Sequence, residues 1–161
     1  MTGMSKILRY AMNVLAVRDH SERELRRKMA VYAQSAYDSA DTEPGALNEQ
    51  VEHVLTHCRQ QGWLDDHRYA CRYITSRCRK GYGLQRIVAE LNQRGIDKST
   101  QHLAVISCDI DWQLQAKTVA SRKFGTTLPT DWSSRLKVQR YLLYRGFSHD
   151  DIQSMYMNFS D

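Results

Sequence analysis

The sequence predicts an all-α fold of tandem three-helix repeats, with three units and about nine helices stacked into an elongated, curved body. Apolar residues recur three and four positions apart along nearly all of the 161 residues, as they do on one face of a helix. One helix pattern occurs three times, and glycines or capping residues separate the apolar stretches. A small helical unit used repeatedly gives an extended body, because each unit packs mainly on its neighbours.

The repeated pattern is a small residue that can start a helix, followed by two apolar residues four positions apart. Its three copies are Ser21 with Leu25 and Met29, Gly83 with Ile87 and Leu91, and Ser134 with Val138 and Leu142. The second and third copies also end alike, as Gln93-Arg94-Gly95-Ile96 and Tyr144-Arg145-Gly146-Phe147. We therefore expect each copy to be the second helix of a three-helix unit.

The first unit is predicted to span residues 5–62. Its first helix carries an apolar stripe at Ile7, Ala11 and Leu15. Residues 21–24 have the form of a capping box, in which the Ser21 hydroxyl takes a helix-terminal amide and the Glu24 side chain returns to the serine amide. This box starts the second helix of the unit.

Residues 34–46 lose the helical period and contain Pro44, so they are predicted to form an inserted loop. The third helix of the unit follows and is expected to end at Gly62. Its apolar residues are Leu47, Val51, Val54, Leu55 and Cys58.

The second unit is predicted to span residues 63–108. Asp65 or Asp66 can cap its first helix, and the turn around Tyr82 leads into its second helix, which ends at Gly95. The third helix starts at Asp97 or Ser99 and carries Leu103 and Ile106 as its apolar residues. Val105 and Ile106 leave a strand open as an alternative at this position.

The third unit is predicted to span residues 109–161. Its first helix ends near Gly125, and Pro129 lies in the following loop. The second helix stops at Gly146, and Ser148 with Asp151 resembles a further cap. The apolar positions are Trp112, Ala116, Val119 and Ala120 in the first helix, Val138, Tyr141 and Leu142 in the second, and Ile152, Met155, Tyr156 and Phe159 in the third.

Positive charge is concentrated in two stretches, although the formal net charge is only +5. Residues 68–94 hold seven basic residues and one acid, Glu90, and residues 117–145 hold seven basic residues and one acid, Asp131. Solvated helix faces normally interleave the two signs. A face so nearly free of acids predicts a polyanionic or acidic partner.

Several kinds of site are not expected. The four cysteines include no Cys-x-x-Cys pair, and Cys71 and Cys78 are two helical turns apart, too far for a disulfide, so reduced thiols in the cytoplasm are expected. His53 and His57 lie four apart beside Cys58 but lack a third metal ligand. No apolar run is long enough for a membrane span, and no secretory signal is present. The sequence predicts no catalytic residues, no metal and no cofactor.

Two aromatic features leave alternatives open. The turn at Gly81-Tyr82-Gly83 lies beside Arg79 and Lys80, but it follows a helix rather than a strand, which favours an interhelical turn over a phosphate loop. Tyr82 stays available to contact a partner. The tyrosines at 69, 73, 141 and 144 interleave with arginines, as core residues do or as a stacking platform for single-stranded bases does.

Four blocks of sequence resemble the bacterial RecX family, whose members regulate the RecA recombinase. In chain order they are Arg18-Asp19-His20-Ser21 with Glu24-Leu25-Arg26-Arg27-Lys28-Met29, then Gly62-Trp63-Leu64-Asp65-Asp66 with Arg68-Tyr69-Ala70, then Arg79-Lys80-Gly81-Tyr82-Gly83 with Glu90-Leu91-Asn92-Gln93-Arg94-Gly95-Ile96, and last Leu142-Leu143-Tyr144-Arg145-Gly146-Phe147. Each block alone is a weak signal. Together they cover nearly the whole chain in order, and that combination is specific.

The resemblance implies a cytoplasmic, monomeric regulator without catalytic activity, acting in homologous recombination, DNA repair and the SOS response. It implies binding to RecA and insertion in the groove of the RecA–DNA filament, which suppresses filament extension, ATP hydrolysis and strand exchange. The family has no catalytic residues to transfer, and its motif residues are mainly caps, helix stops and core positions. Residues 34–46 match no family motif.

We expect the basic faces of the second and third units to line one concave surface that binds RecA and nearby DNA phosphates. The residues expected to bind the filament are Arg72, Arg79, Lys80, Arg86, Lys137, Arg140 and Arg145. Direct DNA binding is expected to be weaker than filament binding. The alternative is a basic helical DNA-binding protein that acts without RecA, which would show tight, strongly salt-dependent binding to naked DNA.

Overall fold

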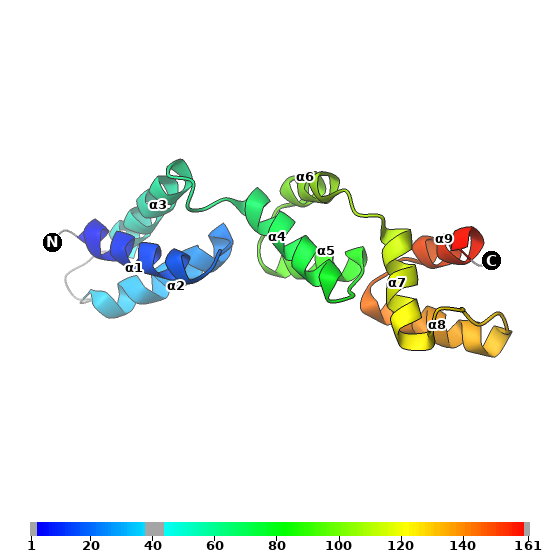
Figure 1. The fold of residues 1–161 in the computed structure, drawn as a ribbon. Helices are drawn as coiled ribbons and strands as arrows, with labels where there is room; N and C mark the ends of the chain where they lie inside the picture. The colour runs from blue at the N-terminus through cyan, green and yellow to red at the C-terminus, as the bar shows by residue number, and fades with distance from the viewer. Residues whose placement is uncertain (1–2, 38–43, 160–161) are drawn as a thin grey trace. The chain divides into compact units, whose positions relative to one another are not determined.

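The described residues, 3–37 and 44–159, form helices joined by short turns, and no strand occurs among them (Figure 1). The computed structural model therefore confirms the all-α class. The helices are α1 (Gly3–Val17), α2 (Glu22–Ala36), α3 (Pro44–Gln60), α4 (Asp66–Arg79), α5 (Leu84–Gln93), α6 (Lys98–Cys108), α7 (Trp112–Phe124), α8 (Trp132–Arg145) and α9 (His149–Phe159). No helix in this part of the chain is both long and apolar enough to cross a membrane.

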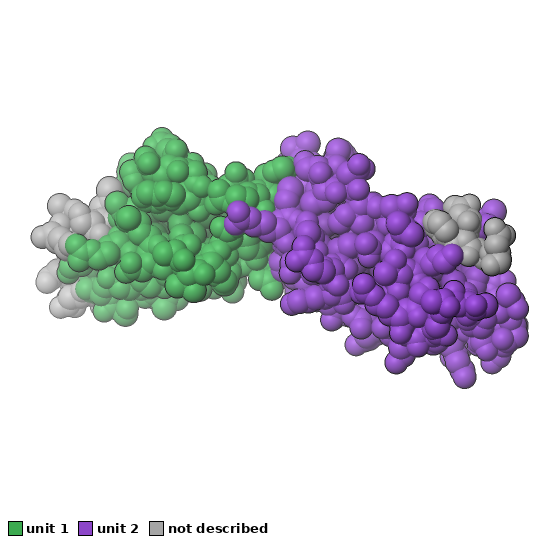
Figure 2. Space-filling view, viewed as in Figure 1, with its two compact units in different colours: residues 1–69, 94–97 green, residues 70–93, 98–161 purple. Residues whose placement is uncertain are grey.

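The chain divides into two compact units, which Figure 2 shows in separate colours. Unit 1 comprises residues 1–69 together with residues 94–97, and unit 2 comprises residues 70–93 together with residues 98–161. Helix α4 therefore begins in unit 1 and continues in unit 2. The three units drawn from the sequence remain a proposal, as does the elongated, curved shape.

The core of unit 1 lies where α1, α2 and α3 pack against one another. Ile7 and Ala11 of α1, Leu25 and Met29 of α2, and Leu55 of α3 are fully buried there. Their spacing puts each set on one helix face, so the apolar stripes predicted from the sequence meet in one core. Gly62, in the left-handed conformation with φ of 75°, ends α3 as predicted, and the Trp63 amide donates to the Cys58 carbonyl at 2.9 Å.

The start of α2 confirms one half of the predicted capping box and corrects the other. The Ser21 hydroxyl accepts from the Glu24 amide at 3.2 Å, as an N-cap should. The Glu24 carboxylate instead accepts hydrogen bonds from Arg18, Tyr69 and Arg94. Two of these three donors are cations, whose hydrogen bonds to a carboxylate are stronger than a bond from the serine amide, and the third is the hydroxyl of the buried Tyr69.

Both candidate caps of α4 are used, but at different helices. Asp65 Oδ1 accepts from the Arg68 amide at 3.1 Å and caps α4 itself. Asp66 Oδ1 accepts from the Glu22 amide at 2.8 Å, so this aspartate satisfies a terminal amide of α2. Burial raises the pKa of Asp66, and the bond from Glu22 acts against that rise.

The predicted loop at 34–46 is shorter in the structure. Helix α2 continues to Ala36, and α3 already begins at Pro44, so helix occupies both ends of the predicted loop. Pro44 is the first helical residue, where its missing amide would have no partner in any case. Residues 38–43 lie outside the described residues.

The second large core, in unit 2, lies between α7, α8 and α9. Ala116 and Ala120 of α7, Leu142 of α8, Phe147 and Met155 are fully buried there. Ser148 Oγ accepts from the Asp151 amide at 3.0 Å, which confirms the predicted cap of α9. The start of α8 differs from the repeat pattern, because Asp131 caps the helix and its carboxylate accepts from the Ser134 amide at 3.0 Å. Ser134 therefore lies inside the first turn.

Helix α6 confirms a helix where a strand had been the alternative, but its buried face is not the predicted one. Leu103 and Ile106 are 56% and 60% exposed, whereas Gln101 and Ala104 are buried. Gln101 donates to the Asn92 side chain of α5 at 2.5 Å. The buried face of α6 thus carries Gln101 and a small alanine, and the larger apolar residues Leu103 and Ile106 face solvent.

The first and second copies of the repeated helix begin in the same way, against the end of the next copy. In unit 1 the Ser21 hydroxyl donates to the carbonyl oxygen of Arg94, which follows α5, at 2.8 Å. In unit 2 the Gly83 amide donates to the Arg145 carbonyl at 2.8 Å, and the Gln85 amide donates to the Gly146 carbonyl at 3.0 Å. Donors at the start of one helix thus meet carbonyls at the end of another, through a hydroxyl in unit 1 and through backbone amides in unit 2.

Candidate functional site

Tyr82 is held in a fixed position by the turn between α4 and α5. Gly81 has a φ of 93°, which a residue with a Cβ rarely adopts, and the Tyr82 amide donates to the Arg77 carbonyl at 3.1 Å. The next residue, Gly83, is bonded to the end of α8. The backbone that carries Tyr82 is therefore anchored on both sides, and the turn is the interhelical turn that the sequence favours.

Three guanidinium groups surround the Tyr82 ring. The Cζ atoms of Arg77, Arg86 and Arg145 lie 4.0, 4.5 and 4.8 Å from the ring centroid. They come from α4, α5 and α8, so residues far apart in the chain meet at one aromatic ring. We call Arg77, Tyr82, Arg86 and Arg145 the Tyr82 cluster. Cation–π attraction offsets part of the repulsion between the three charges.

One carboxylate, Glu90 of α5, lies against the Tyr82 cluster. It accepts from Arg77 at 2.9 Å, from Arg86 at 3.4 Å and from the Tyr73 hydroxyl. Burial by itself would raise the pKa of Glu90, but the hydrogen bonds from Tyr73 and Arg77 outweigh it and keep the pKa below its usual value. Glu90 therefore stays ionised at neutral pH and neutralises one of the three guanidinium charges.

Arg145 is the arginine of the Tyr82 cluster that does not contact Glu90. Its Nε donates to the Tyr141 hydroxyl at 3.3 Å, and its guanidinium lies 5.4 Å from the Tyr141 ring centroid. Within residues 3–37 and 44–159, no carboxylate pairs with it. The Tyr82 cluster with Glu90 thus has two more positive charges than negative ones, and such an excess attracts phosphates or carboxylates of a partner.

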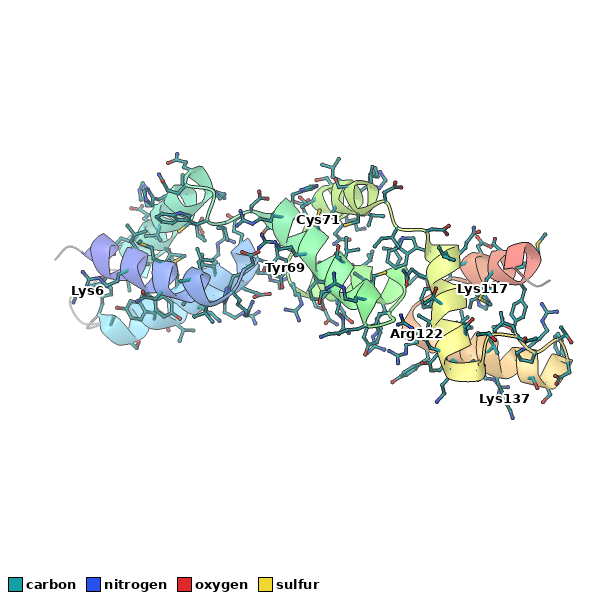
Figure 3. All side chains as sticks on the ribbon, viewed as in Figure 1. Lys6, Tyr69, Cys71, Lys117, Arg122 and Lys137 are labelled. Carbon is teal, nitrogen blue, oxygen red and sulfur yellow. The ribbon has the colours of Figure 1, made fainter. Side chains whose placement is uncertain are left out.

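The structure brings two of the seven predicted binding residues, Arg86 and Arg145, together at Tyr82. The other five are exposed on α4, on the turn after it and on α8, namely Arg72, Arg79, Lys80, Lys137 and Arg140. Figure 3 labels Lys137 on α8, and Lys117 and Arg122 on α7. Among the described residues, Lys80, Lys137 and Arg140 form no ion pair, so their charges are available to a partner.

Sequence reasoning missed Arg77 and the role of Glu90. Arg77 was counted in the basic stretch but was not selected, because its position at the Tyr82 ring depends on the path of the turn. Glu90 had a visible signal, since it is the only acid among residues 68–94 and lies four residues after Arg86. That spacing puts both side chains on one helix face, where they form an ion pair.

Comparison with known proteins identifies the family. The model of the RecX second three-helix domain matches residues 65–104, and the model of the RecX third three-helix domain matches residues 110–155. The regulatory protein RecX of Pectobacterium atrosepticum is 56% identical over 165 residues, which cover 98% of this chain and 100% of that protein. This chain belongs to the RecX family. The resemblance noted in the sequence is confirmed.

Further RecX proteins match with similar coverage. The regulatory protein RecX of Serratia proteamaculans is 50% identical over 98% of this chain and 99% of its own length. A crystal structure of RecX from Lactobacillus salivarius superposes with a TM-score of 0.77 over 97% of this chain and 96% of that chain, at 20% identity. At that identity the likeness supports the fold alone, which is the RecX fold.

Proposed function

We propose that this RecX protein is a negative modulator of the RecA recombinase that acts in the cytoplasm as a monomer. It binds RecA and lies in the groove of the RecA–DNA filament, where it suppresses filament extension, ATP hydrolysis and strand exchange. The membership of the RecX family supports the regulatory role. The observation that supports the contact surface is the Tyr82 cluster, because it concentrates uncompensated positive charge on a rigid part of unit 2.

The chemistry of this surface suits a large acidic partner better than a small ligand. The cluster side chains are half-buried and fixed by Tyr82 and Glu90, so little side-chain freedom is lost when a partner binds. Exposed cations on α8 extend the positive charge beyond the cluster. Guanidinium groups bind carboxylates and phosphates in a bidentate manner. A filament offers both, as acidic side chains of RecA and phosphates of DNA.

The test reverses exposed charges while leaving the Tyr82 cluster intact. The test variant is Lys80→Glu, Lys137→Glu and Arg140→Glu, three positions without ion pairs in the described part of the chain. A matched control makes the same change in net charge at other exposed positions, as Arg9→Glu, Arg27→Glu and Lys98→Glu. Circular dichroism checks that both variants keep their helices. We expect the test variant alone to lose inhibition of the RecA ATPase on single-stranded DNA.

Binding to naked DNA separates the regulator from a plain DNA-binding protein. Each phosphate neutralised on duplex DNA contributes about −0.9 to the slope of log affinity against log salt. If the protein is a RecA regulator, we expect weak binding to naked DNA and tight binding to the assembled filament. If the test variant and the control variant inhibit the RecA ATPase equally, the proposed surface is wrong. If the protein binds naked DNA tightly and added RecA has no effect on that binding, the proposed function is wrong.

A further inference from the structure

Trp132 is the most exposed tryptophan of the described residues. It is the first residue of α8 and is 77% exposed, whereas Trp63 is 37% exposed and Trp112 is partly buried. The cap of α8 is supplied by the neighbouring Asp131, so the indole has no part in starting the helix. A single exposed apolar residue is common on protein surfaces, so the exposure of Trp132 gains meaning only from what surrounds the ring.

The Trp132 indole forms one wall of a pocket between α8 and α9. The pocket has a volume of about 270 Å³, and its lining includes Trp132, Arg135, Gln139, His149, Ile152 and Tyr156. We call it the Trp132 pocket. It shares no residue with the Tyr82 cluster, so it is a separate feature of unit 2.

The lining of the Trp132 pocket combines a cation, aromatic rings and polar side chains. The Arg135 guanidinium lies 4.3 Å from the centroid of the Tyr156 ring. Gln139 Nε2 and His149 Nδ1 are 3.2 Å apart at the wall formed by both helices. Ile152 is buried and supplies an apolar surface. A ligand that suits this lining is flat, has polar edges and carries negative charge close by.

The Tyr156 hydroxyl is a polar group in need of a partner. The residue is only 8% exposed, and its hydroxyl oxygen is buried without a hydrogen-bond partner among the described residues. The Arg135 guanidinium lies over the ring and close enough to the hydroxyl to act against the rise in its pKa, but no hydrogen bond of good geometry joins the two groups. Burial raises the pKa of Tyr156, which keeps the hydroxyl protonated and able to donate. A buried hydroxyl without a partner is costly, and a bound polar ligand relieves that cost.

We propose that the Trp132 pocket binds one base of a single-stranded nucleic acid. The base stacks on the Trp132 indole, its polar edge meets the hydrogen-bonding groups of the lining, and the adjoining phosphate pairs with Arg135. Charge complementarity favours this occupant, because α8 contains four basic residues, Arg135, Lys137, Arg140 and Arg145, and no acidic residue. Stacking of bases on aromatic side chains combined with a basic track is how proteins bind single strands without sequence preference.

This inference rests on the part of the proposed function that gives the chain a direct contact with DNA. It does not depend on RecA, so its test contains no recombinase. A peptide segment of a partner protein would be a different occupant, and the experiment distinguishes the two. The proposed function is tested separately by inhibition of the RecA ATPase, so the two proposals can fail independently of each other.

The experiment compares two ligands and three variants. The ligands are an oligothymidylate of about a dozen nucleotides and an abasic oligonucleotide of the same length, which keeps the phosphates but has no bases. The variants are Trp132→Leu, which removes the aromatic face, Trp132→Phe, which keeps one, and Trp63→Phe as a tryptophan control in unit 1. Fluorescence anisotropy of labelled oligonucleotide gives affinity, and tryptophan quenching reports contact with the ring.

We expect Trp132→Leu to bind oligothymidylate about tenfold more weakly than the unchanged protein, while Trp132→Phe retains most of the affinity. Trp132→Leu and the unchanged protein should bind the abasic oligonucleotide with the same affinity. Quenching by oligothymidylate should disappear in Trp132→Leu and persist in Trp63→Phe. The salt dependence of the affinity should not change in Trp132→Leu, because the phosphate contacts remain.

Three results would overturn the proposal. The first is no binding of oligothymidylate by the unchanged protein. The second is an equal loss of affinity for both oligonucleotides in Trp132→Leu, which would indicate a general structural effect. The third is unchanged oligonucleotide binding by Trp132→Leu, which would show that the pocket does not hold a base.

Discussion

The Ser21 hydroxyl donates to the Arg94 carbonyl at 2.8 Å while it accepts from the Glu24 amide at 3.2 Å. One small side chain therefore caps α2 and also binds the chain just after α5. The side chain is fully buried, so water cannot replace either bond. The corresponding position of the next copy is Gly83, where a backbone amide makes the equivalent contact with Arg145.

Replacing Ser21 with alanine should lower the free energy of unfolding by about 2 kcal/mol, because a helix cap is lost and a buried carbonyl loses its donor. Asp131→Ala serves as the comparison, since Asp131 is an exposed cap of α8 with no such second contact. We expect Asp131→Ala to lose less unfolding free energy than the Ser21 variant. Urea denaturation followed by circular dichroism measures both, and equal losses would mean that the bond to Arg94 contributes nothing.

Gly83→Ala should destabilise unit 2. A Cβ at this position would lie 2.4 Å from the Gly146 carbonyl carbon and from the Phe147 nitrogen, both backbone atoms that cannot move aside easily. Overpacking of this kind costs about 1–3 kcal/mol. Gly45→Ala is the control, because a Cβ there meets nothing within 4 Å. Thermal denaturation should show a lower midpoint for Gly83→Ala only, and equal midpoints for the two variants would disprove the close approach.

Lowering the pH should reduce the stability of unit 1, because Glu24 becomes protonated. Burial by itself would raise the pKa of Glu24, but hydrogen bonds from Tyr69, Arg18 and Arg94 outweigh it and hold the pKa below its usual value. The ionised form is therefore favoured by folding, and its contribution is present above about pH 4.5 and lost as the pH falls through the lower folded-state pKa. In Glu24→Gln the unfolding free energy should be lower at pH 7 and should fall less steeply below pH 4.5. If the unfolding free energies of Glu24→Gln and the unchanged protein fall in parallel with pH, this expectation is wrong.

Tyr69 should ionise only under strongly alkaline conditions. Burial and its hydrogen bond to Glu24 raise the pKa of Tyr69 to about 12. Folding thus favours the protonated hydroxyl, and this stabilisation is complete below pH 10 and lost as the pH rises toward 12. Tyr69→Phe should remove one late step from the phenolate absorbance titration of the nine tyrosines. If the late step persists in that variant, another tyrosine is responsible for it.

The helices and most of their ends followed from local sequence signals. Periodic apolar residues, glycine stops and capping side chains act within one or two helical turns, so Gly62 and Ser148 could be assigned without tertiary information. The exposed face of α6 could not, because the contact of Gln101 with Asn92 depends on where α5 lies. The start of α8 was assigned three residues late, since the repeat pattern suggested Ser134 although Asp131 is an equally good helix cap and is the one used.

The candidate site was predictable in its charge and not in its geometry. The two basic stretches and their lack of acids are visible in the sequence. The convergence of Arg77, Arg86 and Arg145 on Tyr82 is not, because it requires the turn before α5 to meet the end of α8. Local patterns carry no information on such long-range contacts.

Unit 1 is made from two separate stretches of chain, 1–69 and 94–97. During translation the N-terminal bundle must therefore wait for Arg94 to leave the ribosome before Ser21 can reach its carbonyl partner. By then α4 and α5 have already been synthesised. Domains generally mature as whole units in order of synthesis. In this chain unit 1 is completed only by residues 94–97, which are made after residues 70–93 of unit 2. The biogenesis of the two units is therefore coupled.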